Sequence, residues 1–515
     1  MAVNEDLYYS GSHIFDWVSD QTGIPVDQVN FVISQFTSLF LAGILRIYFK
    51  PQEVGPVVRH SFGLIVGLSL GYFCFGWQAL HLAGLPALCY IVIRTQDPRY
   101  IHRIVLVLAL GYLSFIHIYR IMYTYGYYTL DITGPLMVIT QKVTSTAFNI
   151  HDGIARREED LTPLQKRHAI KVIPSALEYF AFIFQFQTLL AGPAVVYCDY
   201  IDYIHGNHFK GHNHLSGFND DASNQVNVIE PSPTKAVINK ILQTLICGVL
   251  FISLIPMFPL ERVKESDFIE NTGIIYKLVY LSIVLFFVRA RYYYAWLFAD
   301  AICNNSGMGF NGLDDHGQPR WDGTSNVDYF TFELSTNLKD ATAAWNKGTT
   351  KWLREIVYER VNNYKLLLTF ALSSIWHGFY PGYYLTFATG ALFTYAARIG
   401  RRKIRPLFVT SADNSFIYDV LTFVATRISM TYLAFTFALL EFTASVRIYK
   451  SMYLIPHLMA LAIIIFAPLI PTKSVTKKGN STVNNNSKEQ LTCDTNSTNI
   501  VDRETNHNGI TKKTL

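Results

Sequence analysis

Long apolar stretches recur along most of the chain and end near residue 470. A membrane-spanning helix needs about 20 mostly apolar residues, and such stretches lie at 29–49, 61–80, 103–123, 173–192, 236–258, 274–296, 416–440 and 451–470. Shorter or more polar stretches, expected to be tilted, broken or re-entrant, lie at 79–94, 131–150, 366–380 and 383–397. The pattern predicts an all-α, polytopic membrane protein.

Three segments follow from this pattern. Residues 1–28 precede the first apolar stretch, residues 29–470 form one membrane domain, and residues 471–515 are rich in Asn, Thr, Ser and Lys. A segment of that last composition cannot bury enough apolar surface to fold, so we expect a disordered tail. No internal repeat of the kind found in inverted-repeat transporters is visible, which disfavours that class of protein.

Charge is sparse, and its distribution indicates how the chain lies across the membrane. Charged residues make up 16% of the chain, against about 25% in soluble domains. The net charge of +5 lies mostly in short clusters, which is typical of membrane topology and not of nucleic-acid binding. Acidic residues before position 29 predict a luminal N-terminus, and basic clusters at 94–103, 156–171 and 398–405 predict cytosolic loops. The topology between 203 and 339 stays open.

The C-terminal tail carries two signals that exclude each other. Lys512 and Lys513 resemble the dilysine retrieval signal of endoplasmic reticulum membrane proteins, which is read in the cytosol. Glycosylation, which takes place in the lumen, would use the sequon-like triplets at Asn480, Asn485 and Asn496. The basic cluster at 398–405 favours a cytosolic tail, so we expect a multi-pass protein of the endoplasmic reticulum membrane.

One histidine, His377, lies inside an apolar stretch, where an ionisable residue is a functional candidate. Pro381 and Gly382 follow it and are expected to break the helix. A helix broken within a membrane needs a protein-lined or wet cavity around it, and a neutral imidazole there could accept a proton near physiological pH. A structural histidine, hydrogen-bonded between helices, is the alternative that the residues leave open.

Apolar residues between 337 and 361 recur at helical spacing and predict one amphipathic helix, at the membrane surface or packed on the bundle. Asn346 falls on its apolar side together with Thr350, Leu353 and Val357. The opposite, polar side is expected to carry Lys347, Lys351, Arg354 and Glu355. An amide on the apolar side needs a partner and could donate to a developing oxyanion. A plain polar helix residue is the alternative.

Other polar groups are weaker candidates for a catalytic or metal-binding role. Ser373 and Ser374 precede His377, but no GxSxG elbow surrounds them, and we interpret them as packing residues. Glu178, inside the stretch at 173–192, could line a pathway or pair between helices. The Gly- and Asn-rich setting of a histidine-rich segment indicates a connector and not a metal site, and this segment carries His205, His208, His212 and His214.

Short motifs follow one another in a specific order. They lie at 131–137, 141–142, 151–153, 174–175, 178–179, 191–193, 352–353 and 357–360. Further motif residues are Trp321, Asp322, Trp345, Asn346, Thr350, Trp376, His377, Gly378, Pro381, Gly382, Tyr383 and Tyr384. The ordered set resembles the membrane-bound O-acyltransferase family, and within it the lysophospholipid acyltransferases that act on lysophosphatidylethanolamine and lysophosphatidylserine. The resemblance runs from the first apolar stretch to residue 470.

The resemblance implies about eleven membrane helices, with re-entrant and amphipathic helices, around a buried catalytic chamber. It implies that His377 and Asn346 are the catalytic pair and that the other motif residues bind substrate or support the site. The implied substrates are a lysophospholipid and acyl-CoA within the lipid bilayer. Acyl-CoA would be a co-substrate, and neither a cofactor nor a metal is implied.

The predicted reaction moves a fatty acyl group from acyl-CoA to the free sn-2 hydroxyl of lysophosphatidylethanolamine, -serine or -choline, as in phospholipid remodelling. His377 would be the general base, and Asn346 would hold the oxyanion or the histidine. Direct transfer is preferred because no activated Ser or Cys is apparent. A protein or peptide O-acyltransferase of the same family, or a lipid or solute transporter, are the alternatives. Head-group and acyl-chain preference, the residues that contact CoA and the oligomeric state do not follow from the sequence.

Overall fold

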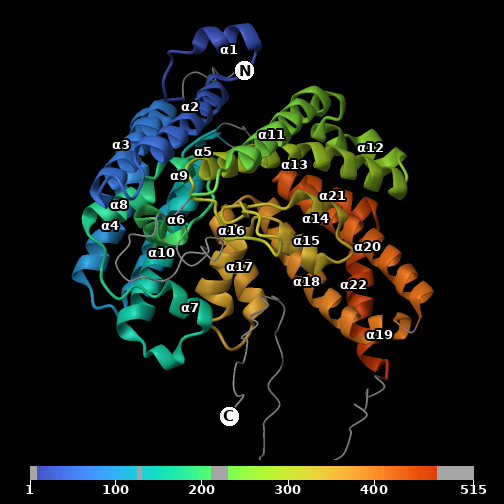
Figure 1. Ribbon diagram of the computed structural model, residues 1–515. Helices are drawn as coiled ribbons and strands as arrows, with labels where there is room; N and C mark the ends of the chain where they lie inside the picture. The colour runs from blue at the N-terminus through green and yellow to red at the C-terminus, as the bar shows by residue number, and fades with distance from the viewer. Residues whose placement is uncertain (1–8, 125–129, 210–229, 410, 472–515) are drawn as a thin grey trace, which may run out of the picture. The chain divides into compact units, whose positions relative to one another are not determined.

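The computed structural model describes residues 9–124, 130–209, 230–409 and 411–471, and its regular structure is helical apart from one isolated bridge between Leu313 and Pro319 (Figure 1). The longer helices are α2 (Val26–Tyr48), α3 (Pro56–Phe75), α4 (Ala79–Thr95), α5 (Ile101–Thr124), α6 (Thr133–Ile150), α11 (Thr234–Leu254), α13 (Ile274–Asn305), α17 (Lys365–His377), α18 (Pro381–Lys403), α20 (Ala412–Leu439) and α22 (Ile455–Phe466). The shorter helices are α1 (Asp16–Thr22), α7 (Pro163–His168), α8 (Ala176–Phe184), α9 (Phe186–Leu189), α10 (Tyr197–His205), α12 (Ser266–Asn271), α14 (Tyr329–Leu334), α15 (Leu338–Ala344), α16 (Lys347–Leu353), α19 (Arg405–Phe408) and α21 (Phe442–Ser451). The predicted helical fold is confirmed.

Several helices are long and apolar enough to cross a membrane. They are Val26–Tyr48, Pro56–Thr95, Ile101–Tyr123, Thr234–Met257 and Ala412–Leu439. A bent pair, α21 followed by Ile455–Leu469, also passes this test as one unit, with an angle of 72° between its halves. The stretch predicted at 451–470 is therefore the second arm of a broken element. The number of spans stays a prediction.

The stretch predicted as one span at 173–192 is wrong, because two short helices, α8 and α9, occupy it. The helix α8 begins with a capping box: the Ser175 hydroxyl accepts from the backbone N–H of Glu178, and the Glu178 carboxylate accepts from the backbone N–H of Ser175. This reciprocal pair satisfies two backbone donors that a helix start leaves free. Glu178 is thus a capping residue at a helix N-terminus.

The other end of α8 is closed by Lys142, which lies on α6 and is almost fully buried. Its ammonium donates to the carbonyl oxygens of Phe182 and Ile183 at 3.0 and 3.1 Å, and to the Thr188 hydroxyl at 2.8 Å. A cation at a helix C-terminus interacts favourably with the helix dipole. The lysine therefore ties the broken segment to α6 and satisfies carbonyl groups that the break exposes.

The single amphipathic helix predicted over 337–361 is also wrong. The segment is divided into α15, α16 and the π-helical turn η8 (Arg354–Tyr358), with a break at Trp345 and Asn346. Thr350, expected on the apolar side, is exposed. Glu355, expected on the polar side, is buried and its carboxylate lies 3.3 Å from Nδ1 of His168. The break changes the register of the helix, and the faces assigned from a continuous period therefore do not hold.

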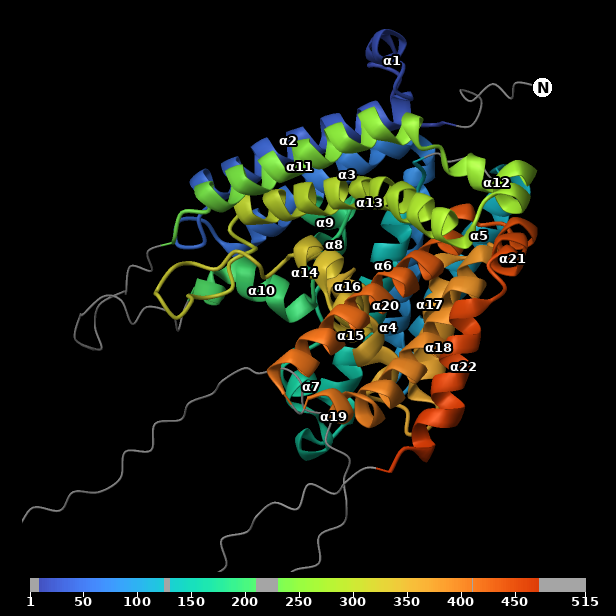
Figure 2. The ribbon, with the colours of Figure 1, turned by 90° about the vertical axis from the view of Figure 1, so that its right-hand side faces the viewer.

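Two hydrophobic cores meet at the junction between α17 and α18. The first core contains Leu372 and Trp376 of α17 together with side chains of α3–α6 and α8–α10. The second contains Phe393 of α18 together with side chains of α12, α20, α21 and α22. The helix α17 packs on both α5 and α18 (Figure 2). The end of α17, where His377 lies, therefore joins the two cores.

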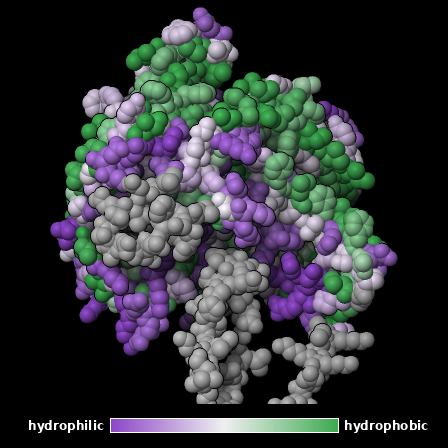
Figure 3. Space-filling model, viewed as in Figure 1, coloured by the Kyte–Doolittle hydropathy of each residue, from purple (hydrophilic) through white to green (hydrophobic). Residues whose placement is uncertain are grey.

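The outer helices expose many large apolar side chains, among them Phe40 on α2, Leu242 and Val249 on α11, and Ile465 on α22. Figure 3 shows hydrophobic residues along the upper edge of the face seen in Figure 1, and hydrophilic residues over its central and lower parts. Contiguous exposed apolar surface of this kind marks contact with lipid or protein. The distribution fits helices that face a bilayer around a polar central region.

Candidate active site

His377 is the last residue of α17, and the helix ends there as predicted. Gly378 follows with φ +114°, in the backbone region that favours glycine. Pro381 is the first residue of α18, where its fixed φ and missing N–H suit a helix start. The break that Pro381 and Gly382 predict is confirmed, and it leaves the imidazole at a helix end between the two cores.

One hydrogen bond orients the His377 ring. Its Nδ1 lies 2.7 Å from the carbonyl oxygen of Ser373. A carbonyl oxygen can only accept, so Nδ1 carries the proton, and Nε2 of the neutral ring keeps its lone pair. Nε2 has no hydrogen-bond partner among the residues described. The structure thus presents a neutral imidazole whose basic nitrogen is available to a ligand.

The two serines beside His377 have structural roles. Ser373 contributes its backbone carbonyl to the histidine, and its side chain is buried. The Ser374 hydroxyl donates to the carbonyl oxygen of Phe370, one turn earlier, at 2.8 Å. Back-bonding of this kind is common for hydroxyl residues within helices. Both observations agree with the interpretation of these serines as packing residues.

Aromatic rings surround the imidazole. The ring centroids of Trp376, Phe387, Phe437 and Tyr383 lie 4.5, 4.8, 5.3 and 5.8 Å from that of His377. These rings come from α17, α18 and α20, so three helices enclose the histidine. Apolar walls of this kind limit the access of water to a reacting group.

A second histidine, His117 on α5, lies against the same helix end. Its Nε2 donates to the carbonyl oxygen of Trp376 at 3.2 Å, and the side chain is buried. A Cβ atom on Gly378 would approach Nδ1 of His117 to 3.0 Å. His117 is not among the residues predicted from the sequence, although a lone histidine within the apolar stretch 103–123 was a signal that could have found it.

Asn346 is held by the break before α16. It has φ 45° and ψ 57°, a left-handed conformation that asparagine adopts more readily than most residues. As the N-cap, its Oδ1 accepts from the backbone N–H of Thr349 at 3.4 Å. Asn326 accepts from the next two backbone N–H groups, those of Lys347 and Gly348, at 2.8 and 2.9 Å. The Asn346 amide NH₂ has no protein partner among the residues described, so it can donate to a ligand.

The helices that carry His377 and Asn346 are brought together on α6. The helix α16 packs against α17, and the Trp352 and Trp376 rings lie 5.8 Å apart. Trp352 donates to the Thr144 hydroxyl at 2.9 Å, and Trp376 donates to the Met137 carbonyl at 3.0 Å. No hydrogen bond joins the Asn346 amide to the His377 ring within the described ranges. The two residues therefore belong to one packed unit. Neither occupies the Nε2 of His377 or the NH₂ group of Asn346 in the other.

Among the remaining motif residues, Tyr383 and Gly382 also lie at this site. Tyr383 contacts His377 and packs on Phe437 with ring centroids 4.6 Å apart, whereas its neighbour Tyr384 is 38% exposed. The Gly382 N–H donates to the carbonyl oxygen of Leu440 at 2.8 Å, and a Cβ atom at this position would overlap α20. Gly382 thus permits the close approach of α18 and α20.

Trp321, Asp322, Trp345 and Thr350 form no hydrogen bond or ring contact with His377 in the part of the chain that the structure describes. The Trp321 carbonyl accepts from the Lys240 ammonium at 2.8 Å in the loop before α14. Burial raises the pKa of the Asp322 carboxyl, but hydrogen bonds from Asn311 and Arg320 outweigh it, and the net shift is downward. Trp345 packs on Trp296 with ring centroids 5.0 Å apart. Trp345 therefore belongs to an aromatic layer next to Asn346, whereas Trp321 and Asp322 lie in the loop before α14.

No group of three or more His, Cys, Asp or Glu side chains suited to a metal ion occurs in the part of the chain that the structure describes. His208 lies 3.3 Å from the Asp202 carbonyl oxygen through Nδ1 and 3.2 Å from the Gly307 carbonyl oxygen through Nε2. Burial lowers the pKa of His208 to about 4. His212 and His214 of the histidine-rich segment lie outside the described residues.

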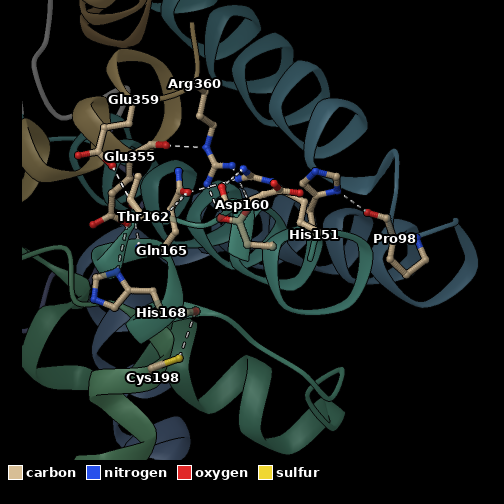
Figure 4. Close-up of polar contacts among 12 residues, drawn as sticks. Pro98, His151, Asp160, Thr162, Gln165, His168, Cys198, Glu355, Glu359 and Arg360 are labelled. Atoms are coloured by element: carbon tan, nitrogen blue, oxygen red, sulfur yellow. Dashed lines mark hydrogen bonds and ion pairs between the residues drawn. The ribbon is translucent and has the colours of Figure 1, made fainter. Parts of the chain in front are cut away.

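A buried polar network anchors the turn η8, which follows α16 (Figure 4). The Arg360 guanidinium binds both carboxylate oxygens of Asp152 at 2.9 and 2.6 Å, and Arg156 binds the same carboxylate at 3.2 Å. Asp152 lies in the π-helical turn η3 (His151–Ala155), at the end of α6. A small pocket between α6 and α16 is lined by Gln141, Ser145, Ala194, Val195, Val196, Gly348, Lys351, Trp352 and Glu355. The network fixes the end of α16 to α6.

The profile of the membrane-bound O-acyltransferase family matches residues 117–436, which is more than half of the chain and includes His117, Asn346 and His377. This chain belongs to the membrane-bound O-acyltransferase family. Like the other members of this family, it is an O-acyltransferase.

Relatives of this O-acyltransferase cover nearly all of its length. It is 49% identical to Lysophospholipid acyltransferase 6 of Drosophila melanogaster over 96% of this chain and 69% of the relative. It is 40% identical to Membrane-bound glycerophospholipid O-acyltransferase 1 of Homo sapiens over 93% of this chain and 97% of the relative. It is 33% identical to Lysophospholipid acyltransferase of Schizosaccharomyces pombe over 87% of this chain and 88% of the relative.

Proposed function

We propose that this O-acyltransferase moves a fatty acyl group from acyl-CoA to the free sn-2 hydroxyl of a lysophospholipid. The names of its relatives support the acceptor class. The observation that carries the chemistry is the hydrogen bond from His377 to the Ser373 carbonyl, which leaves Nε2 unprotonated inside an aromatic enclosure. Phospholipid remodelling at the endoplasmic reticulum membrane, with a cytosolic C-terminus, is the setting that we infer.

In the proposed mechanism, Nε2 of His377 accepts the proton of the lysophospholipid hydroxyl. The oxygen attacks the thioester carbonyl, the carbon–sulfur bond breaks, and the proton passes from the imidazolium to the CoA thiolate. A positioned general base of this kind contributes about 10²–10⁴-fold in rate. The reaction then leaves the acylated phospholipid and free CoA, with the histidine returned to its neutral form.

Asn346 serves as the donor in this mechanism. Its NH₂ group has no protein partner among the residues described, and its Oδ1 is fixed by the Thr349 N–H. A fixed donor that stabilises a developing oxyanion contributes roughly 10²–10³-fold in rate. No metal ion and no acyl-enzyme are required, because the hydroxyl attacks the thioester directly.

The test is a matrix of lysophospholipid head groups and acyl-CoA chain lengths, assayed on the purified full-length enzyme. His377→Ala is the blank, and His316→Ala, which removes an exposed loop histidine, is the matched control. We expect acylated product from the wild type and from His316→Ala, and none from His377→Ala, which still binds acyl-CoA. A fully active His377→Ala enzyme would overturn the assignment of the base.

Two other functions give different results in the same experiment. A peptide O-acyltransferase of this family would acylate none of the lysophospholipids in the matrix. A transporter would move lipid or solute across vesicles even when His377 is replaced. Either result would exclude the proposed reaction, whereas dependence of lysolipid acylation on His377 would support it.

A further inference from the structure

Two arginines and one glutamate form a cluster between α13, α14 and α20. The Arg289 guanidinium binds both carboxylate oxygens of Glu333, at 2.8 and 3.0 Å. Arg427 binds the same carboxylate at 3.4 Å and also donates to the Phe332 carbonyl at 2.7 Å. The Tyr293 hydroxyl adds a further hydrogen bond to Glu333 at 2.8 Å. One carboxylate therefore accepts from three side chains, two of which are cations.

The cluster has one more positive than negative charge, because two arginines share one glutamate. Glu333 is the only carboxylate paired with Arg289 or Arg427 among the residues described. The Nε of Arg427 is buried and has no hydrogen-bond partner. Arg427 lies mid-way along α20, which is long and apolar enough to cross a membrane. An unbalanced charge within a membrane helix is costly, and an ionisable residue there is a functional candidate.

The cluster is also accessible. The side chains of Arg289, Glu333 and Arg427 are 12%, 20% and 23% exposed, so none of the three is fully covered. An anion with several oxygens could bind both guanidiniums, since arginine is the side chain best suited to hold phosphate through paired N–H groups. Glu333 already balances one of the two positive charges, so one further anionic group would balance the other.

The position of the cluster relates it to the candidate catalytic residues. Both guanidiniums lie over the Phe332 ring, at 5.4 and 5.8 Å from its centroid. That ring packs on Trp345, the residue before Asn346, with centroids 5.0 Å apart. The same helix α20 carries Phe437, whose ring touches His377. Ten residues of helix separate Arg427 from Phe437, which is about 15 Å.

We propose that Arg289 and Arg427 bind a phosphate group of a substrate during acyl transfer, with Glu333 neutralising only one of the two guanidiniums. The proposal rests on the proposed function, in which both substrates carry phosphate. The separation along α20 is of the order of the pantetheine arm between the thioester of acyl-CoA and its nearest phosphate. In a lysophospholipid only the glycerol carbons separate the phosphate from the reacting hydroxyl. The spacing therefore favours acyl-CoA as the source.

The experiment compares each substrate with a counterpart that lacks phosphate, on the purified full-length enzyme. Lysophosphatidylethanolamine is paired with a monoacylglycerol of the same chain, and acyl-CoA with the S-acyl-pantetheine thioester. The variants are Arg289→Gln, Arg427→Gln and Glu333→Gln. Arg447→Gln is the control, because Arg447 on α21 is a half-exposed arginine that pairs with Glu270 of α12 at 3.6 Å. The unfolding temperature in detergent is measured for each protein.

Loss of either arginine in the cluster should raise the KM of the phosphate-bearing substrate about tenfold or more, as expected for a lost hydrogen bond to a charged group. Activity with the phosphate-free counterpart should stay unchanged. Collapse of the preference for acyl-CoA over the pantetheine thioester identifies the donor phosphate. Collapse of the preference for the lysophospholipid over the monoacylglycerol identifies the acceptor phosphate. Either collapse supports the proposal.

Glu333→Gln separates phosphate binding from a purely structural ion pair. Removing the carboxylate raises the local positive charge, so the KM of the phosphate-bearing substrate should fall. A structural tie between α13, α14 and α20 would instead lower the unfolding temperature and leave the ratio of KM values untouched. This variant keeps both arginines, so it distinguishes phosphate binding from a structural ion pair even if the arginine variants do not fold.

Three results would overturn the proposal. They are equal losses with the phosphate-bearing and phosphate-free substrates, unchanged KM values in folded arginine variants, and a raised KM in Glu333→Gln. Failure of the proposed function looks different, because the wild-type enzyme would then acylate no lysophospholipid at all. A wild type that acylates lysophospholipids while the variants keep its selectivity would exclude the phosphate site alone.

Discussion

The Nδ1–H of His377 donates to the backbone carbonyl oxygen of Ser373 across 2.7 Å. This bond sets the tautomer of the ring and the direction of its basic nitrogen, because the carbonyl belongs to the same helix one turn earlier. The helix itself therefore provides the orienting group that other acid–base sites obtain from a carboxylate. The orientation depends on α17 staying helical up to its last residue and ending there.

Asn346 can act as a helix cap and as a hydrogen-bond donor to the reacting group. Its substitution by glycine tests the two roles separately. Asn346→Gly keeps the left-handed conformation and, as an N-cap, costs only a few tenths of a kcal/mol. Asn346→Ala loses the cap, at about 0.5–2 kcal/mol, and strains the left-handed backbone by roughly 1–2 kcal/mol. We expect Asn346→Gly to unfold near the wild-type temperature while turnover falls about 10²–10³-fold. Wild-type turnover in Asn346→Gly would assign Asn346 to capping alone.

Gly378 is required where α17 ends. Gly378→Ala places a Cβ 3.0 Å from Nδ1 of His117 in a backbone conformation with φ +114°, which strains the chain by about 1–3 kcal/mol. We expect a lower unfolding temperature and a large loss of turnover, because relief of the strain moves His377. The control is Gly111→Ala in the middle of α5, where a new Cβ meets nothing within 4 Å. That control should keep wild-type activity, with stability raised by up to about 1 kcal/mol.

Two neighbouring tyrosines should respond differently. Tyr383 packs on His377 and Phe437, whereas Tyr384 is 38% exposed and stacks on Phe379 at 6.4 Å. We expect Tyr383→Leu to lower kcat several-fold, since an aromatic pair contributes about 0.5–1.5 kcal/mol beyond its buried area. Tyr384→Leu should retain activity. Initial rates at saturating substrates measure both, and equal effects would contradict the placement of the Tyr383 ring at the site.

The ion pair of Asp152 and Arg360 should be a main source of stability for the region around η8. The Asp152 side chain is fully covered, and removing one partner of a buried pair costs roughly 3–5 kcal/mol. We expect Asp152→Asn to lower the unfolding temperature in detergent by several degrees. The control is Glu159→Gln, which breaks an exposed pair with Arg157, 2.8 Å apart, and should change stability by less than about 0.5 kcal/mol. Equal shifts of the unfolding temperature in the two variants would show that the buried Asp152 pair stabilises the protein no more than the exposed pair does.

Local signals in the sequence predicted the helix break at His377 correctly. Pro381 and Gly382 act through their own backbone preferences, so no distant contact is needed to foresee their effect. The same applies to the start of α8, where Ser175 and Glu178 have the spacing of a capping box. That signal was present, but hydropathy alone suggested one continuous span over 173–192.

Distant contacts decided the features that the sequence did not reveal. The break before α16 depends on Asn326, which accepts from the backbone N–H groups of Lys347 and Gly348. Helical periodicity runs through this break without interruption, so a pattern of side chains cannot detect it. The burial of Glu355 likewise depends on His168, which lies far away in the sequence. Such pairs become visible only once the chain is folded.

The helix α6 is hydrogen-bonded to both candidate catalytic segments: Gln141 donates to Thr349 at 2.7 Å, and Trp352 and Trp376 donate to Thr144 and Met137. Both segments are therefore held in place by the same helix. When the membrane thins, thickens or changes its lateral pressure, the outer helices can tilt, while Asn346 and His377 move together with α6. We therefore expect the spacing of the two groups to depend little on the composition of the bilayer.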